Sequence, residues 1–325
     1  MHRLFAALMA LSMPLLAQAL EELVLQAEHP VDGIPGGNLS GLAWCGEALW
    51  TVSDREDDRL YRLESGEGAW QAQAELFSAP VAPPSGLPWG LRISNGINGV
   101  LRGGQLDFEG LSCDAAGNRY LVSETQAGVL QLPPAGSPRW LELPANLTRQ
   151  ARARGLLLRF NAAYEGLTVD PAGQRLWLAA ERQSRGLLAL QAQANAWACN
   201  GNCVLLRESG DLAAPEVIGG ELAARDFSGL AFYDEKLFTL ERLAHRVCRR
   251  NLDDGAVERC WSFAAEALTD ERRYNRAYGM AEALWLDEQG AWIGLDNGFH
   301  PRGDDDARPI IWRFAAPAGG WSAAR

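Results

Sequence analysis

Residues 108–124 read Phe-Glu-Gly-Leu-Ser-Cys-Asp-Ala-Ala-Gly-Asn-Arg-Tyr-Leu-Val-Ser-Glu. Two short apolar strands flank the sequence Asp-Ala-Ala-Gly-Asn, in which the glycine can supply the positive φ that a tight turn needs. Apolar runs of this length around such a turn are typical of a β-hairpin. The segment therefore predicts two antiparallel strands, the second of which ends at the acid Glu124.

The same pattern occurs in five places along the chain, as it does in proteins built from structural repeats. Each copy combines an apolar strand, a turn and a second apolar strand that closes on an acid. The copies cover residues 39–54, 108–124, 164–181, 227–241 and 281–296. Four copies carry a glycine early in the first strand, and the fifth has alanine in its place; these residues are Gly41, Gly110, Gly166, Gly229 and Ala283.

The spacing of the copies predicts an all-β fold, a β-propeller with five blades of four antiparallel strands. A sixth, degenerate blade hidden in a long interval is the alternative. The residues before the first repeat glycine and those after Ala283 together make up about one more interval, as expected when the two ends of the chain share a blade of a closed propeller. A strand at residues 22–27 is therefore predicted to complete the last blade beside residues 310–314. Residues 80–104 are predicted to form a long loop and residues 145–160 a helical segment, both on the same side of the disc.

The N-terminus has the features of a secretory signal peptide. A positive start precedes an almost entirely apolar run, and Ala17 and Ala19 form a small-residue cleavage site. We therefore expect residues 1–19 to be removed and residues 20–325 to form the propeller domain, in the periplasm or secreted. No other stretch is long and apolar enough to cross a bilayer, so no membrane span is expected.

The composition limits the partners that the protein can have. The 325 residues include 41 acidic and 30 basic ones, which gives a net charge of −11. We do not expect the protein to bind nucleic acid, because a nucleic-acid-binding surface is basic. Hydrophobic residues make up 47% of the chain, too many for a disordered protein. We expect a monomer.

Six cysteines follow the predicted signal peptide, and an even number in an exported chain favours disulfides. Cys199 and Cys203 flank a short loop, and Cys248 and Cys260 flank a hairpin turn, so each pair is predicted to form a bridge. Cys45 and Cys113 would then pair by elimination. The alternative is a metal site, although the spacing lacks histidines and does not match a standard zinc pattern.

Alignment of the copies brings acids into two columns. The residue before the repeat glycine is acidic in three copies, as Glu109, Glu165 and Glu282, and serine in the other two. The residue that closes the second strand is acidic in all five copies, as Asp54, Glu124, Glu181, Glu241 and Asp296. One column starts a strand and the other ends its antiparallel neighbour. Both columns are therefore predicted to lie on one face of the disc, around the central channel.

Eight carboxylates in one funnel need a neutralising charge. Hard divalent cations take oxygen ligands, so the two columns predict a metal site, with Ca²⁺ first and the first-column acids as its main ligands. Arginines are the other source of positive charge, because Arg55, Arg182 and Arg242 each follow a second-column acid. Together with Asn297 and His300, they are predicted to contact an anionic substrate.

A structural explanation of the columns remains open. Acids at equivalent strand ends can accept backbone N–H groups from the next blade, and the arginines can simply pair with them. The sequence has neither the G-x-S-x-G elbow of an α/β-hydrolase nor the H-E-x-x-H motif of a metalloprotease. No catalytic residue is therefore assigned from the sequence.

The repeats resemble those of the phytase-like β-propeller family, which is also called the esterase-like activity of phytase family. The resemblance covers about residues 30–315 and depends on five motifs in order, including residues 106–124, residues 161–173 and Leu295-Asp-Asn-Gly-Phe. It implies an exported propeller that hydrolyses phosphate or other esters, and with the metal site predicted from the columns the expected function is a metal-dependent hydrolase of small esters. The alternative is a non-catalytic propeller that binds a ligand or protein partner in the cell envelope. Ala283 departs from the pattern.

Overall fold

The computed structural model describes residues 20–102, 104–159, 163–181, 184–194, 196–276, 280–298 and 300–323. The predicted signal peptide and Arg182 lie outside the described residues. Within these residues, no helix combines the length and the apolar character needed to cross a membrane.

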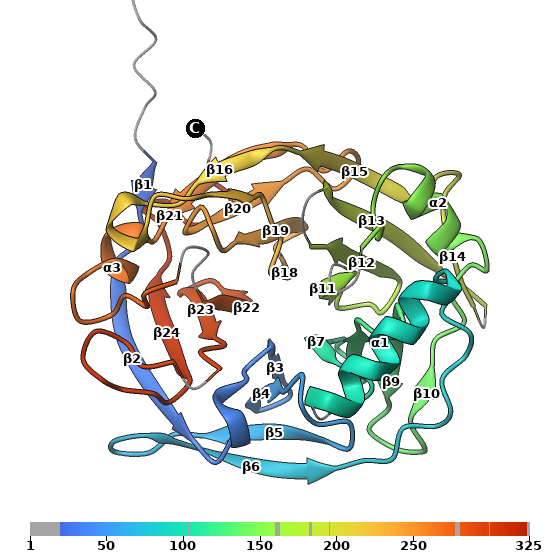
Figure 1. Cartoon of the computed structure of the whole chain (residues 1–325), viewed down its shortest axis with the longest axis horizontal. Helices are drawn as coiled ribbons and strands as arrows, with labels where there is room; N and C mark the ends of the chain where they lie inside the picture. Colours follow the sequence, from blue (N-terminus) through green and yellow to red (C-terminus); the bar gives the residue numbers. More distant parts are fainter. Residues whose placement is uncertain are drawn as a thin grey trace, which may run out of the picture.

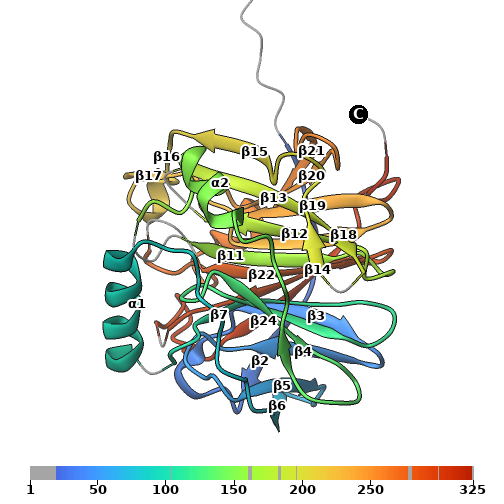
Figure 2. The same ribbon diagram turned by 90° about the vertical axis from the view of Figure 1, so that its right-hand side faces the viewer.

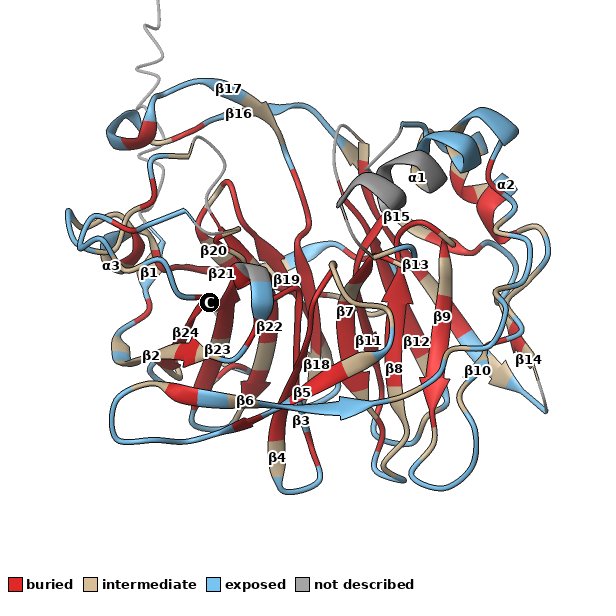
Figure 3. Cartoon of the chain, turned by 60° about the horizontal axis from the view of Figure 1, so that its bottom comes forward, coloured by how far each residue is buried: buried red, intermediate tan, exposed pale blue. Residues whose placement is uncertain are grey.

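Strands surround a central axis as the blades of a β-propeller do (Figure 1). The strands nearest the axis each begin one of the predicted repeats; they are β3 (Gly41–Cys45), β7 (Phe108–Cys113), β11 (Tyr164–Val169), β18 (Gly229–Tyr233) and β22 (Ala281–Asp287). Consecutive members of this set contact each other, and β22 contacts β3, so they form a closed ring. The ring is mostly buried, whereas the connections around it are mostly exposed (Figure 3).

Antiparallel strands extend outward from each inner strand. β3 is followed by β4 (Ala48–Val52), β5 (Arg59–Glu64) and β6 (Trp70–Leu76), and β7 by β8 (Arg119–Ser123), β9 (Gly128–Leu132) and β10 (Arg139–Trp140). β11 is followed by β12 (Arg175–Ala180) and β13 (Ser184–Gln193), with both β14 (Ala196–Ala198) and β15 (Val204–Ser209) pairing with β13. β18 is followed by β19 (Lys236–Glu241), β20 (Arg246–Arg250) and β21 (Val257–Ser262), and β22 by β23 (Gly290–Leu295) and β24 (Ile310–Ala315).

The N-terminal strands close the ring. β2 (Leu25–Asp32) pairs antiparallel with β24, where Leu25 lies opposite Phe314, and parallel with β6, where Val31 lies opposite Trp70. β1 (Glu21–Glu22) pairs parallel with β21. The predicted pairing of the N-terminal strand with the last blade is thus present. The β-propeller is confirmed, whereas the number of blades stays a prediction.

Helices and short hairpins lie between the outer strand of one unit and the inner strand of the next. They are η1 (Pro35–Gly37), α1 (Trp89–Arg102), α2 (Leu147–Ala153), β16 (Asp211–Ala213), η2 (Glu216–Ile218), β17 (Leu222–Ala224) and α3 (Ala264–Ala267). Figure 2 shows α1 and the β16–β17 hairpin on the same side of the disc. The hydroxyl of Thr148 in α2 donates to the carbonyl of Ser85, 3.0 Å away, so the two predicted insertions meet.

The prediction of a long loop at residues 80–104 is wrong over α1. Glycine and asparagine have low helix propensity, but tertiary contacts override propensity. Leu91 packs against the core, and the side-chain amide of Asn95 donates to the carbonyl of Thr125, 3.2 Å away. The helix predicted within residues 145–160 is present as α2.

The three predicted disulfides are present. The Cα–Cα distances are 5.7 Å for Cys45–Cys113, 4.9 Å for Cys199–Cys203 and 4.0 Å for Cys248–Cys260. The first bridge joins β3 to β7 and therefore links neighbouring sheets. With all six thiols bonded, the cysteines form no metal site.

The inner strands come closest at the repeat glycines. A Cβ added to Gly41 would lie 2.6 Å from the backbone nitrogen of Leu111, a distance that real Cβ atoms do not reach. Ala283 is tolerated because Gly294 lies next to it on the paired strand, where a Cβ would come within 3.0 Å of the alanine methyl. The departure from the repeat pattern at one position is thus balanced by a glycine at another.

The axis opens differently on its two sides. On the side opposite α1, a cavity of about 680 Å³, with its open mouth included, is lined by aromatic residues that include Trp44, Phe232, Tyr233 and Trp285. The ring centroids of Trp44 and Trp285 are 5.9 Å apart. The close approach at the glycines separates this apolar mouth from the polar cavity on the other side.

Candidate functional site

A polar cavity lies where the inner strands begin, on the side of the disc that carries α1. Its volume is about 740 Å³ with its open mouth included. Both predicted columns contribute to it, together with their neighbours; the lining includes Asp54, Arg55, Glu109, Glu165, Glu181, Arg242, Glu282, Asp296, Asn297 and His300. The structure therefore brings together most of the residues singled out from the sequence.

Two groups of three carboxylates lie within this region. Oxygens of Asp54, Asp107 and Glu109 lie within 4.8 Å of one another, and so do oxygens of Glu124, Glu165 and Glu181. Five of the six residues are buried and Glu109 is half-buried. Carboxylates this close repel each other when ionised, so each group favours either protons or a cation. Oxygen ligands of this kind suit Ca²⁺ or Mg²⁺.

The pKa values of two acids reflect this crowding. Burial raises the pKa of Glu109 well above its usual value, and the charges of Glu165 and Asp107 raise it further. Burial also raises the pKa of Asp296 to about 7, with Asp54 as the second cause. Without a cation, these two carboxyl groups hold protons at pH values where exposed acids have lost them.

Arg242 is the main positive charge inside the cavity. Its Nε lies 2.9 Å from Asp226 Oδ2, its Nη2 lies 3.1 Å from Glu181 Oε1, and its Nη1 contacts Glu282. Burial would lower the pKa of Arg242, but Asp226 and Glu181 hold it above its usual value. The guanidinium thus joins the ends of three different segments of the ring.

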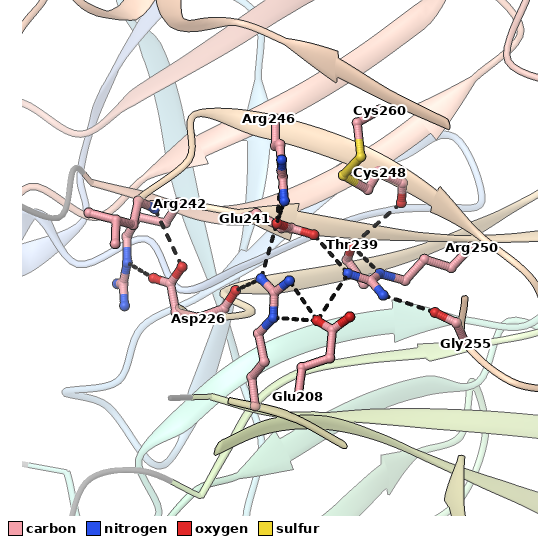
Figure 4. Close-up of polar contacts among 12 residues, drawn as sticks. Glu208, Asp226, Thr239, Glu241, Arg242, Arg246, Cys248, Arg250, Gly255 and Cys260 are labelled. Carbon is pink, nitrogen blue, oxygen red and sulfur yellow. Dashed lines mark hydrogen bonds and ion pairs between the residues drawn. A yellow bond between two sulfur atoms is a disulfide. The ribbon is translucent and has the colours of Figure 1, made fainter. Parts of the chain in front are cut away.

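Two acids of the second column serve the structure instead. Glu124 does not line the cavity, and its Oε1 accepts the backbone N–H of Ala163 at 2.8 Å, as the structural explanation expects. Glu241 lies outside the cavity, with its carboxylate 3.0 Å from Arg185, 2.6 Å from Arg246 and 2.8 Å from Arg250 (Figure 4).

Arginines determine the charge state of Glu241. Burial alone would raise its pKa, but Arg185, Arg246 and Arg250 lower it below the usual value. The carboxylate is therefore fully compensated and has no need of a metal ion.

The residues predicted to contact an anion differ in their exposure and in the partners that they already have. Arg55 lies 3.2 Å from Asp54 Oδ2, and its side chain is 31% exposed, so it can still reach a ligand. The amide nitrogen of Asn297 donates to the carbonyls of His300 and Ala307, at 3.1 and 2.6 Å. His300 is exposed and contacts Arg276.

A third aligned position of the repeats contributes to the site and was not predicted from the sequence. It lies two residues before the first column and comprises Asn38, Asp107, Ala163, Asp226 and Met280. Asp107 completes one carboxylate group, and Asp226 pairs with Arg242. The side-chain amide of Asn38 donates to Asp296 Oδ2 at 3.3 Å. The recurrent Asp-Phe before the first column, at 107–108 and 226–227, was the signal that could have found it.

The chemistry of the cavity fits a divalent cation. Among the described residues, Glu282 Oε2 and Asn297 Oδ1 are buried oxygens that accept no hydrogen bond. Both belong to residues that line the cavity. Buried acceptors normally have partners, so two such oxygens in a cavity with crowded carboxylates are consistent with a cation site.

Comparison with protein families agrees with this architecture. The family model described as "Phytase-like: Esterase-like activity of phytase" matches residues 34–207, more than half of the chain. The chain belongs to the phytase-like family. The matched region contains the first three repeats of this phytase-like chain, and with them both carboxylate groups.

Comparison with solved structures gives matches to the phytase-like chain at low identity. Glutaminyl cyclase from Myxococcus xanthus is 10% identical with a TM-score of 0.50, and the match covers 90% of this chain and 97% of that one. Aldose sugar dehydrogenase from Streptomyces coelicolor is 15% identical with a TM-score of 0.43, over 89% and 98% of the two chains. No curated protein matches the sequence significantly.

Proposed function

We propose that the protein is an exported, divalent-cation-dependent hydrolase of small anionic esters, with phosphate esters as the first class to test. The observation that carries this proposal is the pair of three-carboxylate groups beside one cavity. Membership of the phytase-like family is consistent with ester hydrolysis. The three disulfides are consistent with a location in the periplasm or outside the cell.

The two carboxylate groups would hold the cation, with Ca²⁺ as the first candidate. Asp54, Asp107 and Glu109 form one set of ligands, and Glu124, Glu165 and Glu181 form the other. A bound cation would polarise the ester and neutralise developing negative charge.

The side chains around the cation would divide the remaining tasks. Arg55 is partly exposed at the cavity and would bind the anionic group of the substrate. Arg242 is tied to three acids and would fix their positions. Asp296 lines the same cavity and, in its ionised form, would act as the general base that accepts a proton from the attacking water.

Hydrolysis of an ester panel by the purified protein tests this proposal. Turnover of a phosphomonoester, a phosphodiester or a carboxyl ester should appear with Ca²⁺ and disappear with a chelator. Glu109→Gln should lower kcat/KM at least tenfold, because loss of even a residue that only hydrogen-bonds to a metal ligand typically costs about tenfold or more. Glu64→Gln is the matched control, because Glu64 is exposed on β5. Turnover that is insensitive to the chelator would overturn the metal dependence.

A non-catalytic propeller that binds a ligand or envelope partner is the second candidate. The structural partners of Glu124 and Glu241 favour it, because repeat acids that bind backbone N–H groups or arginines do not require a catalytic role. Ca²⁺-dependent thermal stabilisation without turnover of any ester in the panel would support this alternative over hydrolysis.

A further inference from the structure

Two insertions on the cavity side of the disc are free of acidic residues. Residues 77–106 and 143–164 contain no Asp or Glu, although the chain as a whole carries a net charge of −11. We call the described residues 77–95 and 143–159 the arginine patch. It contains Arg92, Arg149, Arg152, Arg154 and Arg159. Positive charge is therefore concentrated on one part of an otherwise acidic molecule.

Large apolar side chains accompany these arginines at the surface. Val81 is 98% exposed, Trp89 71%, Ile93 42% and Leu158 51%. Trp89 and Ile93 are four residues apart in α1 and so share one face of the helix, with the exposed Arg92 beside them. Single exposed apolar residues are normal on a protein surface. Several of them beside arginines, with a tryptophan among them, instead indicate a binding surface.

The two insertions form one surface rather than two. Thr148 hydrogen-bonds to the carbonyl of Ser85, and Leu87 and Leu147 belong to the same buried cluster. In Figure 3, α1 and α2 lie side by side along one edge of the propeller. The amide of Asn95 reaches Thr125, which directly follows Glu124, so the patch borders the region of the carboxylate groups.

We propose that the arginine patch docks the protein onto an anionic lipid surface. Arginine attracts anionic headgroups, with each basic residue near the surface strengthening binding by about fivefold. Tryptophan and aliphatic side chains enter the interface, as on amphipathic helices that lie on membranes. The exposed apolar residues favour lipid over an acidic protein or nucleic acid, and the like charge of two patches opposes pairing of two copies through them.

Docking in this way would orient the molecule. The cavity and the patch lie on the same side of the disc, so the cavity mouth would face the headgroup region. The proposal does not depend on hydrolysis, because only the patch residues carry it.

Sedimentation of the full chain with vesicles tests the proposal. Vesicles of phosphatidylcholine mixed with phosphatidylglycerol should bind at least about tenfold more protein than vesicles of phosphatidylcholine alone. The difference should shrink as the salt concentration rises. Equal binding to both vesicles, or no binding to either at low salt, would overturn the proposal.

Variants locate the surface that binds. Arg149→Gln combined with Arg154→Gln should weaken binding by more than about tenfold, and Trp89→Ser should weaken it independently. Arg62→Gln is the control, because Arg62 is exposed on β5 away from the patch. Unchanged vesicle binding by the patch variants would overturn the assignment. A change in their oligomeric mass in solution without an effect on vesicles would identify a second copy as the occupant instead.

The result can be separated from that of the proposed function. The double arginine variant should keep full Ca²⁺-dependent stabilisation and full turnover of soluble esters, since neither arginine lines the cavity. Loss of vesicle binding alone would therefore support docking, whatever the ester panel shows.

Discussion

Asp296 links the electrostatics of the cavity to stability. Its pKa is raised to about 7 by burial and by Asp54, so the folded protein holds a proton that the unfolded chain has released above its ordinary pKa of 3.8. A carboxyl group with a raised pKa contributes less stability as the pH rises from about 4 to 7. The half-buried His29 and the buried His245 have pKa values lowered by burial, and they act in the opposite direction near pH 6.5.

Comparison of the wild type with Asp296→Asn isolates this contribution. In a chelator, the variant should gain stability relative to the wild type as the pH rises from 5 to 7.5, by about 2.5 kcal/mol. Urea unfolding at the two pH values measures the gain. Ca²⁺ should reduce the difference, because a cation removes the cost of ionising the wild-type carboxyl group. A difference that is constant with pH would contradict the raised pKa.

Arg242 should be the most sensitive single charge in the molecule. Arg242→Gln leaves Asp226, Glu181 and Glu282 without their shared partner, which should cost about 3 to 5 kcal/mol of the free energy of unfolding. Arg242→Lys should recover little, because one ammonium group cannot reproduce three separately directed N–H donors.

The matched control is Arg55→Gln. Arg55 also follows a second-column acid, but its side chain is 31% exposed and its ion pair should contribute less than about 1 kcal/mol. Denaturant midpoints of the three variants compare the two sites. Equal effects at both positions would contradict the structural role assigned to Arg242.

The candidate site could be predicted only in part at the level of single residues. Alignment of the repeats and the antiparallel direction of paired strands placed both columns on one face, and the cavity lining agrees with that placement for most of the acids. Neither signal tells which acids are compensated by distant arginines. Arg185 and Arg250 reach Glu241 from other strands, and no local pattern marks them as its partners.

At the scale of elements, the ring of inner strands depends on the repeat glycines. Gly41→Ala should destabilise the protein by at least about 2 kcal/mol, since its Cβ would lie 2.6 Å from the backbone of Leu111 and both strands are buried. Gly90→Ala in α1 is the control, because nothing lies within 4 Å of its Cβ and alanine favours helix by about 1 kcal/mol. Thermal unfolding of both variants checks the expectation; a stable Gly41→Ala would show that the strands can separate.

The disulfide between Cys45 and Cys113 should stabilise more than the one between Cys199 and Cys203. The first closes a loop of 68 residues and the second a loop of 4. Chain entropy predicts about 4 kcal/mol for the long loop and much less for the short one. Paired serine variants, compared by urea unfolding under oxidising conditions, measure both contributions. A larger loss from the short loop would contradict this ranking.

Elements differed in how well the sequence predicted them. The repeated hairpins were clear because turn glycines and apolar runs recur at matching positions. α1 was missed because its glycines and asparagines are typical of loops, while the contacts of Leu91 and Asn95 that support the helix come from other parts of the chain.

At the scale of the whole molecule, the repeats predicted the propeller because each copy must bury its apolar strands against the next one. The chemistry differs between its two sides, with carboxylates at one mouth and tryptophans at the other. That asymmetry follows from strand direction, since all inner strands run from the acidic side to the aromatic side.

The pairing of β2 with both β24 and β6 has a consequence for folding. Residues near 25 pair with residues near 314, so ring closure depends on contacts of very high sequence separation. Such contacts form slowly, and until they form, β24 and β6 expose unpaired strand edges. Refolding from urea should therefore be slow and prone to aggregation at high concentration, and a chaperone that shields strand edges should raise its yield.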